Sequence, residues 1–180
     1  ILNEKDGSLE ISKVPSTIDP LKGTFEGLAK AGVSLVDVSL FSHGTTVATN
    51  ALIERNLPHT ALITTEGFRD IIEIGNATKE DLWDAYKDNP PSYIRRRDRL
   101  TISERTHADG TLEQTVDKEQ AKKLAKILSK RQYKAIAICF INSYTNSTNE
   151  LWLKDYLEKA LPEVAISTSS EVLPEIFEHD

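Results

Sequence analysis

The sequence contains no methionine and only one cysteine. A single thiol forms no internal disulfide, and Cys139 lies in the apolar run 135–141, which is typical of a buried strand. We therefore expect Cys139 to be a small core residue of a cytoplasmic protein. Spacings typical of metal ligands, such as CxxC or HExxH, do not occur. Because the chain begins at Ile1, we expect a fragment whose upstream residues have been removed.

Long apolar runs and an excess of positive charge are also missing. No run approaches the roughly 20 residues of a membrane-spanning helix, and no secretory signal opens the chain, so no membrane partner is expected. The formal net charge of −6 argues against a general nucleic-acid binder, because phosphate neutralisation requires a basic face. Hydrophobic residues make up 39% and charged residues 28%, which is typical of a folded domain with one sizeable core or two small lobes.

The pattern of apolar residues predicts alternating strands and helices in the first third. Asp19 and Pro20 indicate a helix start, and Gly32 indicates its end. The other predicted elements are a hairpin over 1–14, a strand over 36–41, a helix over 47–55 and a strand over 60–65. Helices packed against a sheet follow from this order.

The rest of the chain predicts a second unit of the same class. A hairpin over 100–105 and 111–116 precedes a helix that begins at a capping box of Asp117 and Gln120. A strand over 135–141, a helix opened by Ser147 and Glu150, and a strand over 164–167 follow. We therefore predict an α/β fold with mixed sheets and flanking helices, divided into domains 1–66 and 67–180. The intervening 67–98 region has the character of a functional loop or an interface.

The segment 41–52, FSHGTTVATNAL, predicts a strand, a turn and a helix start. Unpaired amides at a helix N-terminus stabilise an anion, and Gly44 lets it approach closely. Thr45 and Thr46 add hydroxyl donors, while His43 and Asn50 lie within reach of a phosphate or a substrate oxygen. The turn lacks the spacing and the lysine of a Walker A loop. The alternative is that a threonine simply caps the helix and Gly44 serves the turn.

Charged residues after the strand at 60–65 form a second candidate site. Arg69 offers a planar fork for a carboxylate or phosphate, beside the acids Asp70 and Glu73. The alternative is an ion pair between Arg69 and Glu73, which are spaced i, i+4.

Two further groups of charges follow in the sequence. Asp81 and Asp84 are spaced for metal or acid–base roles, or they simply solvate a helix. The run of arginines at 95–97, with Arg99, suits phosphates, a subunit contact or a solvated loop.

These segments, in their order, resemble the N-terminal region of the hydantoinase A, 5-oxoprolinase and acetone carboxylase family. The resemblance rests on FSHGTTVATNALIER (41–55), ALITTEGFRDIIEIG (61–75), RRDRLTISERTHADG (96–110), AIAICFINSY (135–144) and STSSEVLPEIFEH (167–179). It implies part of an actin/hexokinase-like (ribonuclease H-like) nucleotide-binding fold plus a second α/β unit. Residues 1–66 would be an ATPase subdomain that lacks its first strand.

The resemblance also implies an activity. Relatives use ATP, with a divalent metal such as Mg²⁺, to phosphorylate a carbonyl before hydrolysing a cyclic amide (hydantoin or 5-oxoproline) or carboxylating a ketone. His43, Gly44, Thr45, Thr46 and Asn50 would then face the ATP phosphates. The active-site cleft would hold three charged residues, Arg69, Asp70 and Glu73. A second subunit or a C-terminal region would complete the enzyme, so we expect the isolated fragment to be inactive. The alternative is a non-catalytic module whose 83–99 segment docks a partner subunit.

Overall fold

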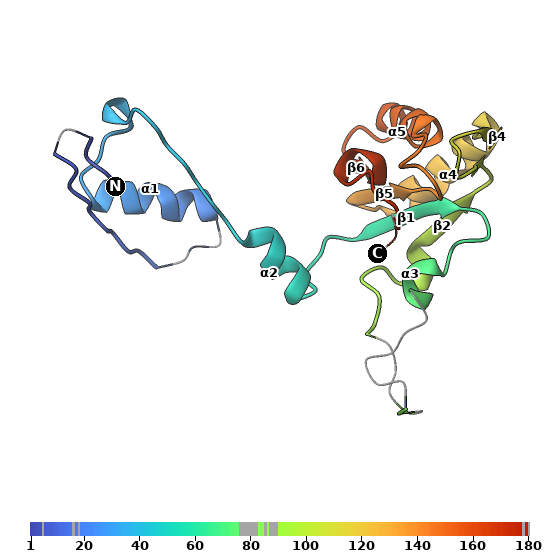
Figure 1. The fold of residues 1–180 in the computed structure, drawn as a ribbon, viewed down its shortest axis with the longest axis horizontal. Coiled ribbons are helices and arrows are strands. Elements are labelled where there is room, and N and C mark those ends of the chain that lie inside the picture. The colour runs from blue at the N-terminus through green and yellow to red at the C-terminus, as the bar shows by residue number, and fades with distance from the viewer. Residues whose placement is uncertain are drawn as a thin grey trace. The chain divides into compact units, whose positions relative to one another are not determined.

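The computed structural model describes residues 1–4, 6–15, 17, 19–75, 83, 84, 86, 90–177 and 179 (Figure 1). The chain forms two compact units, Ile1–Glu54 and Arg55–Asp180, and each is described by itself. The division falls before the strand β1 (Thr60–Thr65), whereas the sequence suggested a domain boundary after residue 66. The physical reason is that β1 pairs on both sides with strands of the second unit.

The first unit contains the helices α1 (Pro20–Lys30) and α2 (Val47–Ile53). The carboxylate of Asp19 accepts a hydrogen bond from the backbone N–H of Leu21 at 3.0 Å, and Pro20 occupies the first turn. Beyond the end of α1, Gly32 adopts a φ of +67°, where a glycine is favoured. The start and the end predicted for this helix are thus confirmed.

The strand predicted over 36–41 is wrong. A single 3₁₀ turn, η1 (Leu35–Asp37), takes its place, and Val36 and Leu40 are 93% and 82% exposed. A strand needs a partner for its backbone groups, and none of the described residues of this unit supplies one here. The predicted hairpin is reduced to one antiparallel bridge between Leu2 and Leu9.

The second unit is built on a four-stranded sheet in the order β2-β1-β5-β6, in which every neighbouring pair is parallel. The remaining strands of this sheet are β2 (Arg99–Ile102), β5 (Ala135–Cys139) and β6 (Ala165–Thr168). This unit also contains two long helices, α4 (Lys118–Arg131) and α5 (Thr148–Ala160). Its short helical elements are α3 (Ile71–Ile74), η2 (Arg96–Asp98) and α6 (Ser169–Val172). The predicted α/β class is confirmed.

The core lies between this sheet and the two long helices. Ala61 and Ile63 of β1 are in register with Ile136 and Ile138 of β5, so these four side chains share one face. They form one buried cluster with residues of α4 and α5, namely Ala121, Leu124, Ala125, Leu128, Leu153 and Leu157. Cys139 is also buried, as the sequence predicted.

The hairpin predicted over 100–116 is only partly confirmed. Residues 99–102 enter the parallel sheet as β2, with Leu100 beside Ile63 of β1. The antiparallel pair consists instead of the short strands β3 (Arg105–Thr106) and β4 (Leu112–Gln114). Pairing of 99–102 with β1 satisfies the backbone groups along one edge of β1. A local hairpin over 100–116 would leave those groups unpaired.

Of the two predicted capping boxes, one is half confirmed, because Gln120 Oε1 accepts from the N–H of Ser103 at 3.2 Å rather than from the N–H of Asp117. Asp117 accepts a hydrogen bond from the N–H of Gln120 at 3.0 Å and so caps α4. At α5, however, Ser147 makes no capping hydrogen bond. The carboxylate of Glu150 is fully buried and accepts from the N–H of Phe140 at 2.9 Å instead. A tertiary contact has replaced the local one.

Within the described part of the chain, no helix is long and apolar enough to cross a membrane.

Replacing Leu153 with alanine should destabilise the second unit by about 2–5 kcal/mol, because it leaves a cavity in a fully buried position of α5. Urea unfolding followed by circular dichroism measures this loss. Leu151→Ala, two residues away and 42% exposed, is the matched control and should cost far less. Equal losses for the two variants would show that the core is not where the structure places it.

Candidate functional site

The turn before α2 is open in the first unit. All residues from 41 to 50 are exposed, and Thr46 is the N-cap residue of α2 without a side-chain capping bond. The hydroxyl of Thr45 accepts a hydrogen bond from the N–H of Val47 at 3.3 Å, so that threonine does take part in a local turn. A Cβ on Gly44 would meet no atom within 4 Å. The space in front of the turn is therefore not filled by this unit.

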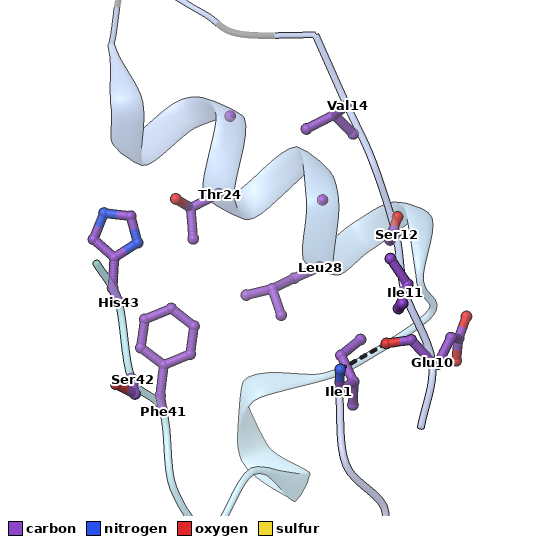
Figure 2. A pocket seen from close by; sticks show the side chains of 12 residues that line it. Ile1, Glu10, Ile11, Ser12, Val14, Thr24, Leu28, Phe41, Ser42 and His43 are labelled. Carbon is purple, nitrogen blue, oxygen red and sulfur yellow. Dashed lines mark hydrogen bonds between the residues drawn. The ribbon is translucent and has the colours of Figure 1, made fainter. Parts of the chain in front are cut away.

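His43 also lines an open cleft of about 400 Å³ beside α1. Figure 2 shows Thr24 and Leu28 projecting from α1 toward the side on which Phe41 and His43 lie. The rings of Phe41 and His43 are stacked, with their centroids 6.5 Å apart. Asn50 lies on α2, and its N–H donates to the carbonyl of Thr46 at 2.8 Å. The segment thus carries two aromatic rings at 41 and 43, followed by exposed amides and threonine hydroxyls at 44–46.

These donors fit phosphate oxygens but do not form a metal site. Amides and hydroxyls at a helix start suit an anion, although α2 has only 7 residues and the segment 41–50 carries no lysine or arginine. Among the described residues, no group of three or more His, Cys, Asp or Glu side chains is gathered to hold a metal ion.

The second unit brings Asp70 and Glu73 together with two arginines. Arg96 donates to both carboxylate oxygens of Asp70, at 2.9 Å each. Arg99, which is 2% exposed, places its Nη1 at 2.7 Å from Glu73 Oε2 and at 3.4 Å from Asp70 Oδ1. The acids and bases of this region are therefore neutralised largely by one another.

Arg69 joins this cluster through a backbone group. Its Nη2 donates to the carbonyl of Arg96 at 2.7 Å, while Glu73 pairs with Arg99. Glu73 thus pairs with Arg99 rather than with Arg69, whereas a phosphate-binding role for Arg69 stays a prediction. The Arg96 hydrogen bond, followed by the charges of the nearby arginines, lowers the pKa of Asp70 below its ordinary value. Asp70 thus stays ionised and is suited to orient a group, although the lowered pKa makes it a weaker base.

The other charged candidates have structural partners or lie outside the described residues. Asp81 is not among those residues, so a paired role with Asp84 stays a prediction. Asp84 itself accepts a hydrogen bond from the N–H of Tyr86 at 2.9 Å. In the arginine run, Arg97 lies 3.6 Å from the buried Asp98. Three of the four arginines of the expected basic patch, Arg96, Arg97 and Arg99, are therefore paired with acids of this unit.

Sequence reasoning missed a buried polar network where β1 and β2 end. Glu104 is 2% exposed and accepts hydrogen bonds from the Thr65 hydroxyl and from Asn149 Nδ2, the latter at 2.9 Å. Burial raises the pKa of Glu104, although these two hydrogen bonds oppose the shift. The sequence placed Glu104 within a predicted strand over 100–105, and that position alone does not reveal burial.

A polar cavity of about 290 Å³ lies beside this network. Its lining consists of Glu66, Ser103, Glu104, Arg105, Glu113 and Gln114. Glu66 accepts a hydrogen bond from Ser103, and Glu113 lies 3.1 Å from His107. Arg105 lies over the ring of Phe68 at 5.2 Å. The cavity thus combines carboxylates with one cation, at the end of the sheet where parallel strands commonly bind ligands.

The chain was compared with protein-family models and with proteins of known sequence. Residues 1–161 match the family model of the hydantoinase/oxoprolinase N-terminal region. The chain is 32% identical over 192 residues to the caprolactamase subunit alpha of Pseudomonas jessenii, covering 99% of this chain and 27% of that protein. It is 30% identical over 158 residues to 5-oxoprolinase of Saccharomyces cerevisiae, covering 74% of this chain and 12% of that protein.

Solved structures agree with these matches. The ATP-dependent caprolactamase of Pseudomonas jessenii superposes with a TM-score of 0.85 at 31% identity, over 99% of this chain and 28% of that chain. A nucleotide-free acetone carboxylase gives a TM-score of 0.79 at 23% identity, over 93% of this chain and 26% of that chain, which indicates a shared fold. The chain thus spans between about an eighth and just over a quarter of the length of these relatives.

Glu104 should make stability depend on pH in a definite direction. Because its pKa is raised in the folded state, the folded chain keeps a proton that the unfolded chain releases. As the pH rises above 4.5, the ordinary pKa of glutamate, the free energy of unfolding should fall relative to that of Glu104→Gln. Urea unfolding at several pH values measures the difference.

The exposed Glu163→Gln is the control for the change in net charge. A wild-type free energy of unfolding that stays constant, or rises, relative to that of Glu104→Gln as the pH increases would contradict the assignment.

Proposed function

Because this chain belongs to the hydantoinase/oxoprolinase family, whose N-terminal region its residues 1–161 match, we propose that it is part of an ATP-dependent enzyme. That enzyme activates a carbonyl by phosphorylation, for hydrolysis of a cyclic amide or carboxylation of a ketone. Support comes from relatives described as caprolactamase, 5-oxoprolinase and acetophenone carboxylase subunits or enzymes. Phosphorylating a carbonyl oxygen is chemically useful, because it turns a poor leaving group into a good one.

The observation that carries the proposal is the open turn at 43–46. A phosphate placed before α2 would meet exposed backbone N–H groups and the exposed side chains of Thr45 and Thr46. His43 would lie at the border between the phosphates and the cleft beside α1. Asn50 stands one turn further along α2, on the same face as Thr46.

The nucleotide and Mg²⁺, when bound, would supply the phosphoryl group and neutralise charge on its oxygens. The chain's own contribution is to orient and hold. Fixed donors around the transferring group stabilise charge without reorganising during the reaction. Thr45 and Thr46 are proposed to do this for the phosphate oxygens, and Gly44 to let the phosphate approach the backbone.

Asp70, Glu73 and Arg69 are proposed to belong to the active-site cleft of the whole enzyme. The lowered pKa of Asp70 keeps its carboxylate ionised, because Arg96 donates to it and further arginine charges surround it. An ionised carboxylate can orient a nucleophile, which does not require it to take up a proton. Arg69 retains a guanidinium edge beyond the two nitrogens, Nε and Nη2, that donate to the Arg96 carbonyl.

A second candidate function is a subunit-interaction module without catalytic groups of its own. The segment before η2 carries large exposed aromatic side chains: Trp83 and Tyr86 are 95% and 97% exposed. Tyr93 follows them, beneath the guanidinium of Arg55 at 4.6 Å. Aromatics and arginines are enriched at protein interfaces. This observation supports the docking of a partner subunit on the second unit.

Replacing both Thr45 and Thr46 with alanine in the full-length protein should lower the turnover number for ATP by about 10²-fold, because transition-state donors are lost. Coupled assays of ADP release measure this. Thr115→Ala removes an exposed hydroxyl of the second unit and is the control. Unchanged turnover in the double variant, with the fold intact, would defeat the site assignment.

The docking role makes a separate prediction. Trp83→Ala combined with Tyr86→Ala should leave ATP turnover by the isolated full-length subunit within about twofold, but weaken its assembly with its partner subunit by about 2 kcal/mol or more, as for hot-spot aromatics. Sedimentation of the mixed subunits measures assembly. Loss of turnover without loss of assembly would point to a catalytic role for this segment instead.

A further inference from the structure

The connection from β1 to β2 carries two carboxylates close together. Asp70 is the N-cap residue of α3, and Glu73 belongs to the first turn of the same helix. Two neighbouring carboxylates repel each other, and without a compensating cation one of them tends to keep a proton. The charge state of the two carboxylates therefore depends on whether a cation lies between them.

A single buried guanidinium stands between them. Arg99 opens β2 and is in register with Leu62 of β1, so the parallel sheet fixes its backbone. Its Nε donates to the carbonyl of Ile94 at 3.0 Å. Its Nη1 reaches Glu73 Oε2 at 2.7 Å and Asp70 Oδ1 at 3.4 Å. One nitrogen thus contacts both acids, while another anchors the side chain.

Arg96 does not duplicate this arrangement. Its side chain is 63% exposed, and its two donated hydrogen bonds both go to Asp70. Glu73, which is 57% exposed on its side chain, makes its ion pair with Arg99. The exposed Arg96 therefore contacts one of the two carboxylates, whereas the buried Arg99 contacts both.

We propose that Arg99 is a positioning residue that holds the side chains of Asp70 and Glu73 in fixed geometry relative to each other. The proposal rests on the proposed function, in which these acids act in the active-site cleft. Arginine suits this role because its charge is permanent and its planar fork serves three acceptors at once. Lysine would supply the charge but not the fork.

The first test is independent of any substrate. Carboxyl-carbon NMR of the labelled chain follows the titration of Asp70 in wild type, Arg99→Lys, Arg99→Gln and Glu73→Gln. Arg99→Gln should raise the pKa of Asp70, because a cation beside it is lost, and Arg99→Lys should raise it less. Glu73→Gln should shift it the opposite way, because a neighbouring negative charge is removed.

Glu73→Gln changes an exposed side chain, so it keeps the test decisive even if the buried Arg99→Gln substitution impairs folding. Arg97→Gln is the matched control, since Arg97 belongs to the same arginine run but pairs with Asp98. An Asp70 titration that is unchanged in both Glu73→Gln and Arg99→Lys would overturn the proposal. An Asp70 pKa that rises in Arg99→Lys and falls in Glu73→Gln would support it.

The second test uses the full-length protein and ATP-Mg²⁺ turnover. If the proposal holds, Arg99→Gln lowers kcat by about 10²-fold through misplacement of the acids, leaves KM for ATP nearly unchanged, and moves the acid limb of the pH–rate profile upward. Arg99→Lys should restore part of the loss.

Asp70→Asn separates this inference from the proposed function. If Asp70→Asn retains turnover while the NMR shifts occur, Arg99 positions the pair but the site assignment fails. If Asp70→Asn abolishes turnover and Arg99→Gln changes neither turnover nor the pH profile, the positioning role is refuted.

Discussion

The second unit depends on the parallel pairing of β1 with β2 on one side and β5 on the other. Five of the six residues of β1 are buried, so its backbone groups must be satisfied by neighbouring strands. The pairing determines where the chain divides, because β1 cannot leave the sheet that completes it. It also brings Arg99 into register with β1, and hence under the connection that carries Asp70 and Glu73.

Burial gives similar acids different properties in this unit. Glu104 is enclosed with neutral donors, Thr65 and Asn149, and burial raises its pKa. Asp98 is also buried, but its pKa is lowered, because the hydroxyl of Tyr133 and the charge of Arg97 outweigh the cost of desolvation. Asp70 is lowered chiefly by its hydrogen bonds with Arg96. Charge state here follows the partner, as expected when desolvation and local cations compete.

The two units differ in how they use their apolar residues. None of the described residues of the first unit is fully buried, whereas the second unit holds the whole buried cluster of the described chain. The proposed phosphate turn lies in the first unit and the carboxylate pair in the second.

The sequence by itself determined the family and the local elements. The motif at 41–55 and its companions led to the family that the comparison confirms, and the caps at Asp19 and Asp117 were read correctly, because a cap depends on residues only a few positions apart. The sequence did not determine whether the space beside Gly44 is open, because that depends on residues distant in the chain. Only the tertiary structure decided that Glu150 leaves its predicted cap for Phe140, that 99–102 joins β1, and that Arg99 reaches two acids. Each of these contacts joins segments distant in sequence or competes with a local bond, and burial decides the competition.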